Sequence, residues 1–159
     1  MSQYSAGISW NRGGATFLDK RYSRAHTWTF DGGVEVRASS SPASVPLPYS
    51  DAAAVDPEEA FVAALASCHM LWFLSIAAKS GFCVDSYEDH AVGRLSPGAG
   101  GKLSMTAVTL RPHVVFTDHK APTPELFEAM HDEAHRECFI ANSVTTRMTT
   151  APTFEVVSA

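Results

Sequence analysis

The sequence has 159 residues, of which 45% are hydrophobic and 18% are charged, and its formal net charge is −5. This length predicts one domain over residues 1–159 that can bury a sizeable core. The acidic balance, with no run of Lys or Arg, argues against a nucleic-acid partner. Three cysteines are too few for a disulfide scaffold.

The N-terminal residues MSQYSAGISW lack the cationic start and apolar core of a signal peptide. The longest apolar stretch, residues 60–78, is interrupted by Ser67, Cys68, His69 and Ser75. These polar residues favour a buried helix over a membrane span. We therefore expect a cytoplasmic protein without a membrane partner, in which free thiols persist.

The first elements expected are a β-hairpin and a loop. Residues 25–41, AHTWTFDGGVEVRASSS, place alternating apolar residues on either side of DGG, a sequence typical of a tight turn. The prolines of residues 41–56, SPASVPLPYSDAAAVD, exclude regular structure for long and indicate a loop.

A long helix is predicted to begin at Asp56 and to end near Ser80. Asp56 can cap it, Pro57 suits its first position and Glu59 lies three residues after the cap. Gly81 can terminate it. The helix is apolar nearly all round, which predicts burial on every side, and this is more easily achieved in a dimer than in one small domain.

The second half predicts strands around another helix. Residues 83–96 and 102–117 read as two strands joined by PGAGG, and Pro112 bends the second strand or places it at an edge. Thr123 caps a helix that runs to about Cys138, and residues 143–158 close the chain as a strand broken near Pro152. The order of elements predicts an α+β fold.

The cysteines are the candidate reactive groups. Cys83 follows a helix end among apolar residues, where a thiol is usually packing material. Cys68 lies within the long helix and Cys138 at the end of the second helix, so the two could approach across a core. Such a pair would permit a redox couple in which one thiol attacks and the other resolves.

Two segments resemble one known family. VDPEEAFVAALASCHMLWFL, residues 55–74, resembles the helix of the OsmC/Ohr family (osmotically inducible and organic hydroperoxide resistance proteins) that carries a Pro-Glu pair and an Ala-Cys pair. ECFIANSVTT, residues 137–146, resembles the family's second cysteine segment, although Phe139 replaces the usual proline. The resemblance implies an OsmC-like α+β fold, with antiparallel sheets around long central helices, in an intertwined homodimer.

The same resemblance implies an enzyme that reduces organic hydroperoxides with thiols and needs no metal or other cofactor. Cys68 would be the attacking thiolate and Cys138 the resolving thiol. Glu58 would hold an essential arginine, for which Arg24 fits best, with Arg21 and Arg12 as alternatives. The substrate would be an organic hydroperoxide, and a dithiol or thiol would restore the enzyme.

Two other interpretations remain open. His131 and His135 lie at i and i+4 of the second predicted helix, as a metal-binding pair would, although a solvated helix face explains them equally. The chain could also be a non-catalytic dimeric module that binds an apolar small molecule. The departure at Phe139 favours that module, whereas the retained pair of cysteines argues against it.

Overall fold

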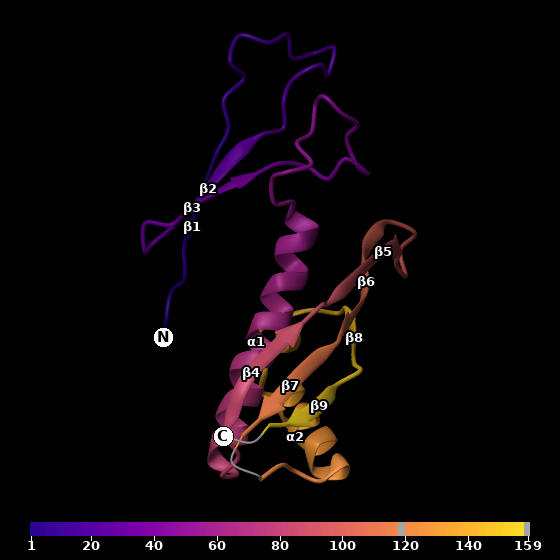
Figure 1. The fold of residues 1–159 in the computed structure, drawn as a ribbon. Coiled ribbons are helices and arrows are strands. Elements are labelled where there is room, and N and C mark those ends of the chain that lie inside the picture. The colour runs from indigo at the N-terminus through magenta and orange to yellow at the C-terminus, as the bar shows by residue number, and fades with distance from the viewer. Residues whose placement is uncertain (118–119, 158–159) are drawn as a thin grey trace. The chain divides into compact units, whose positions relative to one another are not determined.

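The structure is a computed structural model that describes residues 1–117 and 120–157 (Figure 1). Contacts divide the chain into two compact units, Met1–Ala60 and Phe61–Ala159. Helices and strands follow one another in a mixed α+β order, as the sequence predicts. The predicted single domain over residues 1–159 stays a prediction.

The first unit contains an antiparallel sheet in the order β1-β2-β3. The predicted hairpin is confirmed: β2 (His26–Phe30) pairs with β3 (Glu35–Ala38) around the DGG turn. The strand β1 (Ala6–Ser9), which pairs with β2, was not predicted. Every residue of β1 is exposed, so its sequence carries no alternation of buried and exposed positions.

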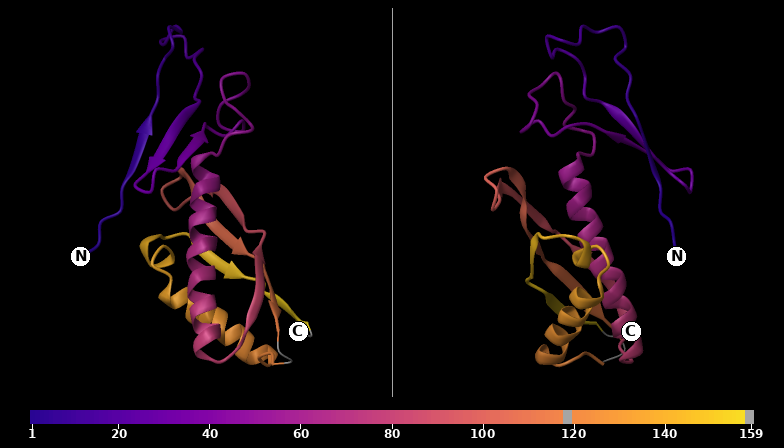
Figure 2. Two further views of the ribbon diagram at one scale, coloured as in Figure 1. Left: turned by 60° about the vertical axis from the view of Figure 1, so that its left-hand side comes forward. Right: turned by 180° about the vertical axis from the view of Figure 1, so that it is seen from behind.

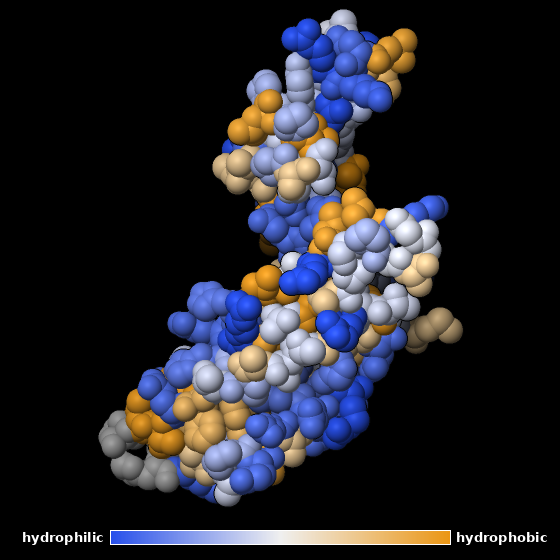
Figure 3. Space-filling model, turned by 90° about the vertical axis from the view of Figure 1, so that its right-hand side faces the viewer, coloured by the Kyte–Doolittle hydropathy of each residue, from blue (hydrophilic) through white to orange (hydrophobic). Residues whose placement is uncertain are grey.

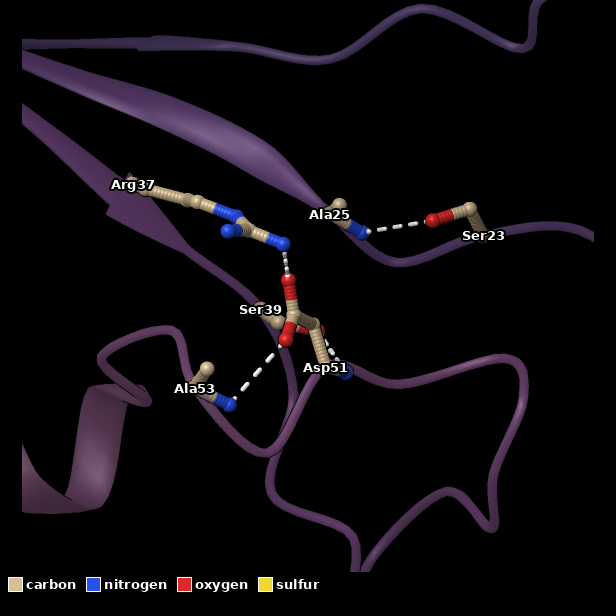
Figure 4. Close-up of polar contacts among 6 residues, drawn as sticks. All are labelled: Ser23, Ala25, Arg37, Ser39, Asp51 and Ala53. Carbon is tan, nitrogen blue, oxygen red and sulfur yellow. Dashed lines mark hydrogen bonds and ion pairs between the residues drawn. The ribbon is translucent and has the colours of Figure 1, made fainter.

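Asp51 fastens the proline-rich loop to β3 (Figure 4). Its carboxylate accepts hydrogen bonds from Arg37 of β3 and from the backbone N–H of Ala53, the latter at 3.0 Å. Its own N–H donates to the hydroxyl of Ser39, also at 3.0 Å. These side-chain bonds add to backbone bonds at the end of the loop, where the N–H of Ser39 donates to the carbonyl of Val55 and the N–H of Val55 donates to the carbonyl of Arg37.

The helix α1 (Pro57–Lys79) has the predicted bounds and cap. The backbone N–H of Glu59 donates to Oδ1 of Asp56 at 2.8 Å, and the N–H of Asp56 donates to Oε2 of Glu59 at 3.0 Å. This reciprocal pair is a capping box. At the other end Gly81 has a φ of 76°, a backbone conformation that glycine adopts without strain.

The sequence of α1 is long and apolar enough to cross a membrane, which is weak evidence for a span because core helices pass the same test. Its buried side chains follow helical spacing on one face, where they pack against the rest of the second unit: Leu65, His69, Phe73, Ile76 and Ala77. Leu71 on another face is 61% exposed. The helix therefore behaves as a core helix with one uncovered apolar side.

The second unit contains two sheets. Each of its three extended segments of chain contributes one strand to each sheet. Their orders are β4-β7-β9 and β5-β6-β8. Each predicted strand of the hairpin divides in two, giving β4 (Val84–Asp89) with β5 (Val92–Pro97), and β6 (Leu103–Leu110) with β7 (Pro112–Phe116). The break before Pro112 is the predicted bend, and β7 is a central strand.

The terminal strand also divides between the two sheets, giving β8 (Arg147–Thr150) and β9 (Thr153–Val156), with the predicted break near Pro152. β8 runs parallel to β6, and β9 runs parallel to β7. The sheets of this unit are thus mixed, which corrects the expectation of purely antiparallel sheets. The reason is that the chain passes through a helix before it returns, and such a crossover permits parallel pairing.

The helix α2 (Pro124–Glu137) begins at its predicted cap, because the hydroxyl of Thr123 accepts a hydrogen bond from the N–H of Leu126. Helices α1 and α2 both cover one face of the sheet β4-β7-β9 (Figure 2). Their shared core contains Phe73 from α1, Phe116 from β7 and Phe127 from α2. This packing fixes the two helices that carry Cys68 and Cys138.

Candidate functional site

The structure brings Cys68 and Cys138 together in the second unit. Cys68 lies in the middle of α1, and Cys138 is the C-terminal cap of α2. Both are free thiols, and they lie close enough for the Cys68 side chain to raise the pKa of Cys138. The two thiols are therefore neighbours in the fold although they lie far apart in sequence.

The two thiols have different surroundings. Cys138 is fully buried, whereas Cys68 is partly exposed. Burial, followed by the interaction with the neighbouring Cys68 side chain, raises the pKa of Cys138 to about 11, and the N–H that Ala141 donates to its sulfur at 3.4 Å opposes this rise. At neutral pH Cys138 therefore keeps its proton and can donate it to the sulfur of Cys68.

An aromatic contact lies beside the cysteine pair. Trp72, one turn beyond Cys68 on α1, meets Phe139 edge to face with ring centroids 5.5 Å apart. Phe139 directly follows Cys138, and it is 68% exposed. Phe139, which stands where the second cysteine segment was expected to have a proline, therefore connects this segment to α1.

Buried histidines form the other contact between the helices. His69 Nε2 and His131 Nδ1 lie 2.9 Å apart, and the rings are parallel within 3°. This corrects the interpretation of His131 as part of a solvated face: it is 1% exposed, whereas His135 is exposed. Within residues 1–117 and 120–157, no group of three or more His, Cys, Asp and Glu side chains is placed to hold a metal ion.

The sequence reasoning missed this histidine pair, although a signal was present. His131 falls on the apolar stripe of α2, four residues after Phe127 and three before Ala134, and both of these residues are buried. A polar side chain at such a position needs a buried partner. No feature of the sequence identifies that partner as His69.

Arg24 and Glu58 lie in the first unit. Nη1 of Arg24 donates to the carbonyl oxygens of Lys20, at 2.8 Å, and Tyr22, and the guanidinium lies 3.8 Å from the centroid of the Tyr22 ring. Among the described residues of this unit the structure gives Glu58 no ion pair with Arg24. The two residues are therefore not joined here, and their joint role stays a prediction.

The alternative arginines have other surroundings. Arg21 is exposed and donates from Nε to the hydroxyl of Tyr49 at 2.8 Å. Arg12 is exposed in the loop after β1. Arg24 lines a cavity of the first unit, whereas Arg21 and Arg12 do not.

A cavity of about 460 Å³ in the first unit includes Arg24 and Pro57, the first residue of α1. The rings of Trp10, Phe17 and Tyr22 form its aromatic wall. Such a cavity suits an apolar molecule that carries a polar or anionic end.

Comparisons with known proteins agree with this fold. The family model described as OsmC-like protein matches residues 50–152. An OsmC-like protein of unknown function from Vibrio cholerae is 54% identical, with 99% of this chain and 100% of that chain covered and a TM-score of 0.91. A comparison with curated protein sequences gives no match.

More distant structures share the fold. An organic hydroperoxide resistance protein from Elizabethkingia anophelis is 14% identical, with 99% of this chain and 98% of that chain covered and a TM-score of 0.67. An organic hydroperoxide resistance protein OsmC from Legionella pneumophila is also 14% identical, with 98% of each chain covered and a TM-score of 0.63. The family match and the 54% identity together show that the chain belongs to the OsmC-like family.

Proposed function

We propose that the protein is a cysteine-based peroxidase that reduces organic hydroperoxides to alcohols. The Cys68 thiolate attacks one peroxide oxygen, the O–O bond breaks, and the alkoxide takes up a proton and leaves as the alcohol. The resulting Cys68 sulfenic acid condenses with the Cys138 thiol, which releases water and forms a disulfide. A dithiol, or two thiols, then reduces the disulfide.

The observation that carries this proposal is the contact between Cys68 and Cys138. Cys68 is the partly exposed member, so a substrate can reach it, while Cys138 is buried behind it as a protonated thiol. That asymmetry suits an attacking sulfur and a resolving sulfur. Family relatives named organic hydroperoxide resistance proteins support the choice of substrate class.

In this proposal Arg24 supplies the cation at the reaction centre, and Glu58 orients it. A guanidinium has a permanent charge and a planar fork of donors, which suits both a thiolate and a peroxide oxygen.

We further propose a cytoplasmic homodimer. Apolar side chains are exposed on both units, among them Ile8 of β1, Leu71 of α1 and Leu103 of β6, each more than 60% exposed. Orange patches on the space-filling view show this exposure over several parts of the chain (Figure 3). A second copy of the chain would cover such surface.

Turnover of an organic hydroperoxide, such as cumene hydroperoxide, with a dithiol tests the assignment. Cys68→Ser should abolish turnover, and Cys138→Ser should allow one reaction that ends in a sulfenic acid. Cys83→Ser, at an exposed cysteine outside the pair, is the matched control and should keep wild-type turnover. Wild-type turnover in Cys68→Ser would exclude the proposal, and no turnover in the parent protein would favour the binding module.

A further inference from the structure

The buried histidine pair forms a polar link between the helices that carry the cysteines. His69 follows Cys68 on α1, and His131 lies two helical turns before Cys138 on α2. Nε2 of His69 and Nδ1 of His131 lie 2.9 Å apart in the core. The two side chains are 0% and 1% exposed, so water does not compete for this bond.

The pair is neutral. Burial is the main cause that lowers the pKa of His69 to about 4 and of His131 to about 3. One imidazole therefore donates an N–H and the other accepts it. His135 of α2 also lowers the pKa of His69. The His131 ring contacts the apolar rings of Phe73 and Phe127.

Other elements around the pair contribute almost only apolar groups. β7 and β9 face this core with Val114, Phe116 and Phe154. β4 contributes Tyr87, whose ring lies 5.7 Å from that of Phe73, and its hydroxyl stays un-ionised because burial raises its pKa. The histidine bond is therefore a directional polar contact between α1 and α2 in an otherwise mostly apolar core.

The link is not an obvious source of stability. His69 Nδ1 and His131 Nε2 are both buried without a hydrogen-bond partner in the described part of the chain. Leaving buried polar atoms unpaired costs free energy that two apolar side chains would not lose. What the histidines add over apolar residues is a fixed direction and distance between the two helices.

We propose that the His69–His131 hydrogen bond positions Cys68 and Cys138 for disulfide formation. This inference rests on the redox couple of the proposed function. The bond fixes the orientation of α2 relative to α1 next to Cys68. Because α2 is one continuous helix, this orientation also determines the position of Cys138, two turns after His131. His69 and His131 act through the helices and do not react themselves.

The test is the equilibrium between the reduced protein and glutathione disulfide. Two protein thiols are oxidised to one disulfide while one glutathione disulfide is reduced to two glutathione molecules, so the equilibrium constant reports how well the sulfurs are held together. All variants carry Cys83→Ser, and acid quenching with alkylation and mass spectrometry gives the oxidised fraction. Because no hydroperoxide is used, the result does not depend on peroxidase activity.

The variants separate a hydrogen bond from ring packing. His69→Gln places an amide where Nε2 lay and can keep the bond to His131, whereas His69→Phe keeps a ring and loses the bond. We expect the constant to fall about threefold to tenfold in His69→Phe, as for loss of one hydrogen bond, and to stay within about twofold in His69→Gln. His135→Gln, at an exposed histidine of α2, is the matched control and should leave the constant unchanged.

The opposite order would overturn the proposal. If packing alone matters, His69→Phe keeps the wild-type constant and His69→Gln loses it. Should His69→Phe fail to fold, the double variant His69→Phe/His131→Phe leaves no orphaned imidazole and should restore folding. A folded double variant with a lowered constant supports the proposal, and one with the wild-type constant contradicts it.

Discussion

Arg24 is held by the carbonyl oxygens of the loop that precedes β2, so its charge can be presented in a fixed direction. If it assists the reaction of Cys68, Arg24→Ala should slow peroxide reduction by at least about tenfold, the effect of about 1.4 kcal/mol. Arg24→Lys keeps the charge but loses the planar fork, so it should recover little. Stopped-flow rates of the first oxidation measure both variants.

Glu58→Gln should be milder than Arg24→Ala, because it loosens the arginine without removing it. The matched control is Arg94→Lys, which changes an exposed arginine of β5 that is not a candidate for this role. Full activity in Arg24→Ala would move the role to Arg21 or Arg12, and the same measurement on those variants would decide between them.

The histidine pair predicts how stability depends on pH. In the unfolded chain each histidine binds a proton near pH 6.5, whereas burial lowers the pKa in the folded chain to about 4 for His69 and about 3 for His131. Below pH 6.5 the unfolded state therefore binds more protons, and the free energy of unfolding falls as pH drops toward 4. Each histidine contributes up to about 1.4 kcal/mol per pH unit in this window.

Urea unfolding from pH 7 to pH 4.5 measures this dependence. The double variant His69→Phe/His131→Phe lacks both titrating groups, so its stability should fall less steeply with acid. If its curve ran parallel to that of the wild type, the buried neutral pair would not be the source of the pH dependence.

At the scale of elements, the capping box at the start of α1 is the clearest local determinant. Asp56→Ala removes the acceptor for the N–H of Glu59 and should lower the free energy of unfolding by about 1 kcal/mol. Asp56→Asn keeps an oxygen in the same place and should lose much less. Denaturant unfolding compares the two, and equal losses would show that the cap bond is not the cause.

The sequence predicted those elements whose ends are set by local chemistry. Asp56, Pro57 and Gly81 define α1, and Thr123 with Pro124 begins α2. It did not predict that each long strand divides between two sheets, because the breaks at residues 90–91 and 111 depend on which neighbouring strand each half meets. Nor could it place β1, where no residue is buried.

For the site, the sequence supplied the cysteines but not their contact. Cys68 and Cys138 meet because Phe73, Phe116 and Phe127 pack α1 and α2 against one sheet, and this tertiary packing has no local sequence signature. The contact between His69 and His131 also depends on this tertiary packing. A buried polar position could be predicted at His131, but its partner could not.

At the scale of the molecule, the exposed apolar surface predicts an obligate homodimer. Its melting temperature should rise with protein concentration, because dissociation accompanies unfolding. Thermal unfolding over a hundredfold range of concentration, with sedimentation at the lowest, measures this. A folded species of 17.1 kDa with a concentration-independent melting temperature would contradict it.

The most direct test of a redox couple between Cys68 and Cys138 is the fate of the thiols after one equivalent of an organic hydroperoxide. Reduced protein is mixed with the peroxide, quenched with an alkylating reagent and mapped by mass spectrometry. Peroxide reduction by the Cys68–Cys138 pair predicts the loss of two thiols per chain, one Cys68–Cys138 disulfide, one molecule of alcohol and an unmodified Cys83. A protein that keeps all three thiols, or that is oxidised at Cys83 while Cys68 and Cys138 stay reduced, would contradict it.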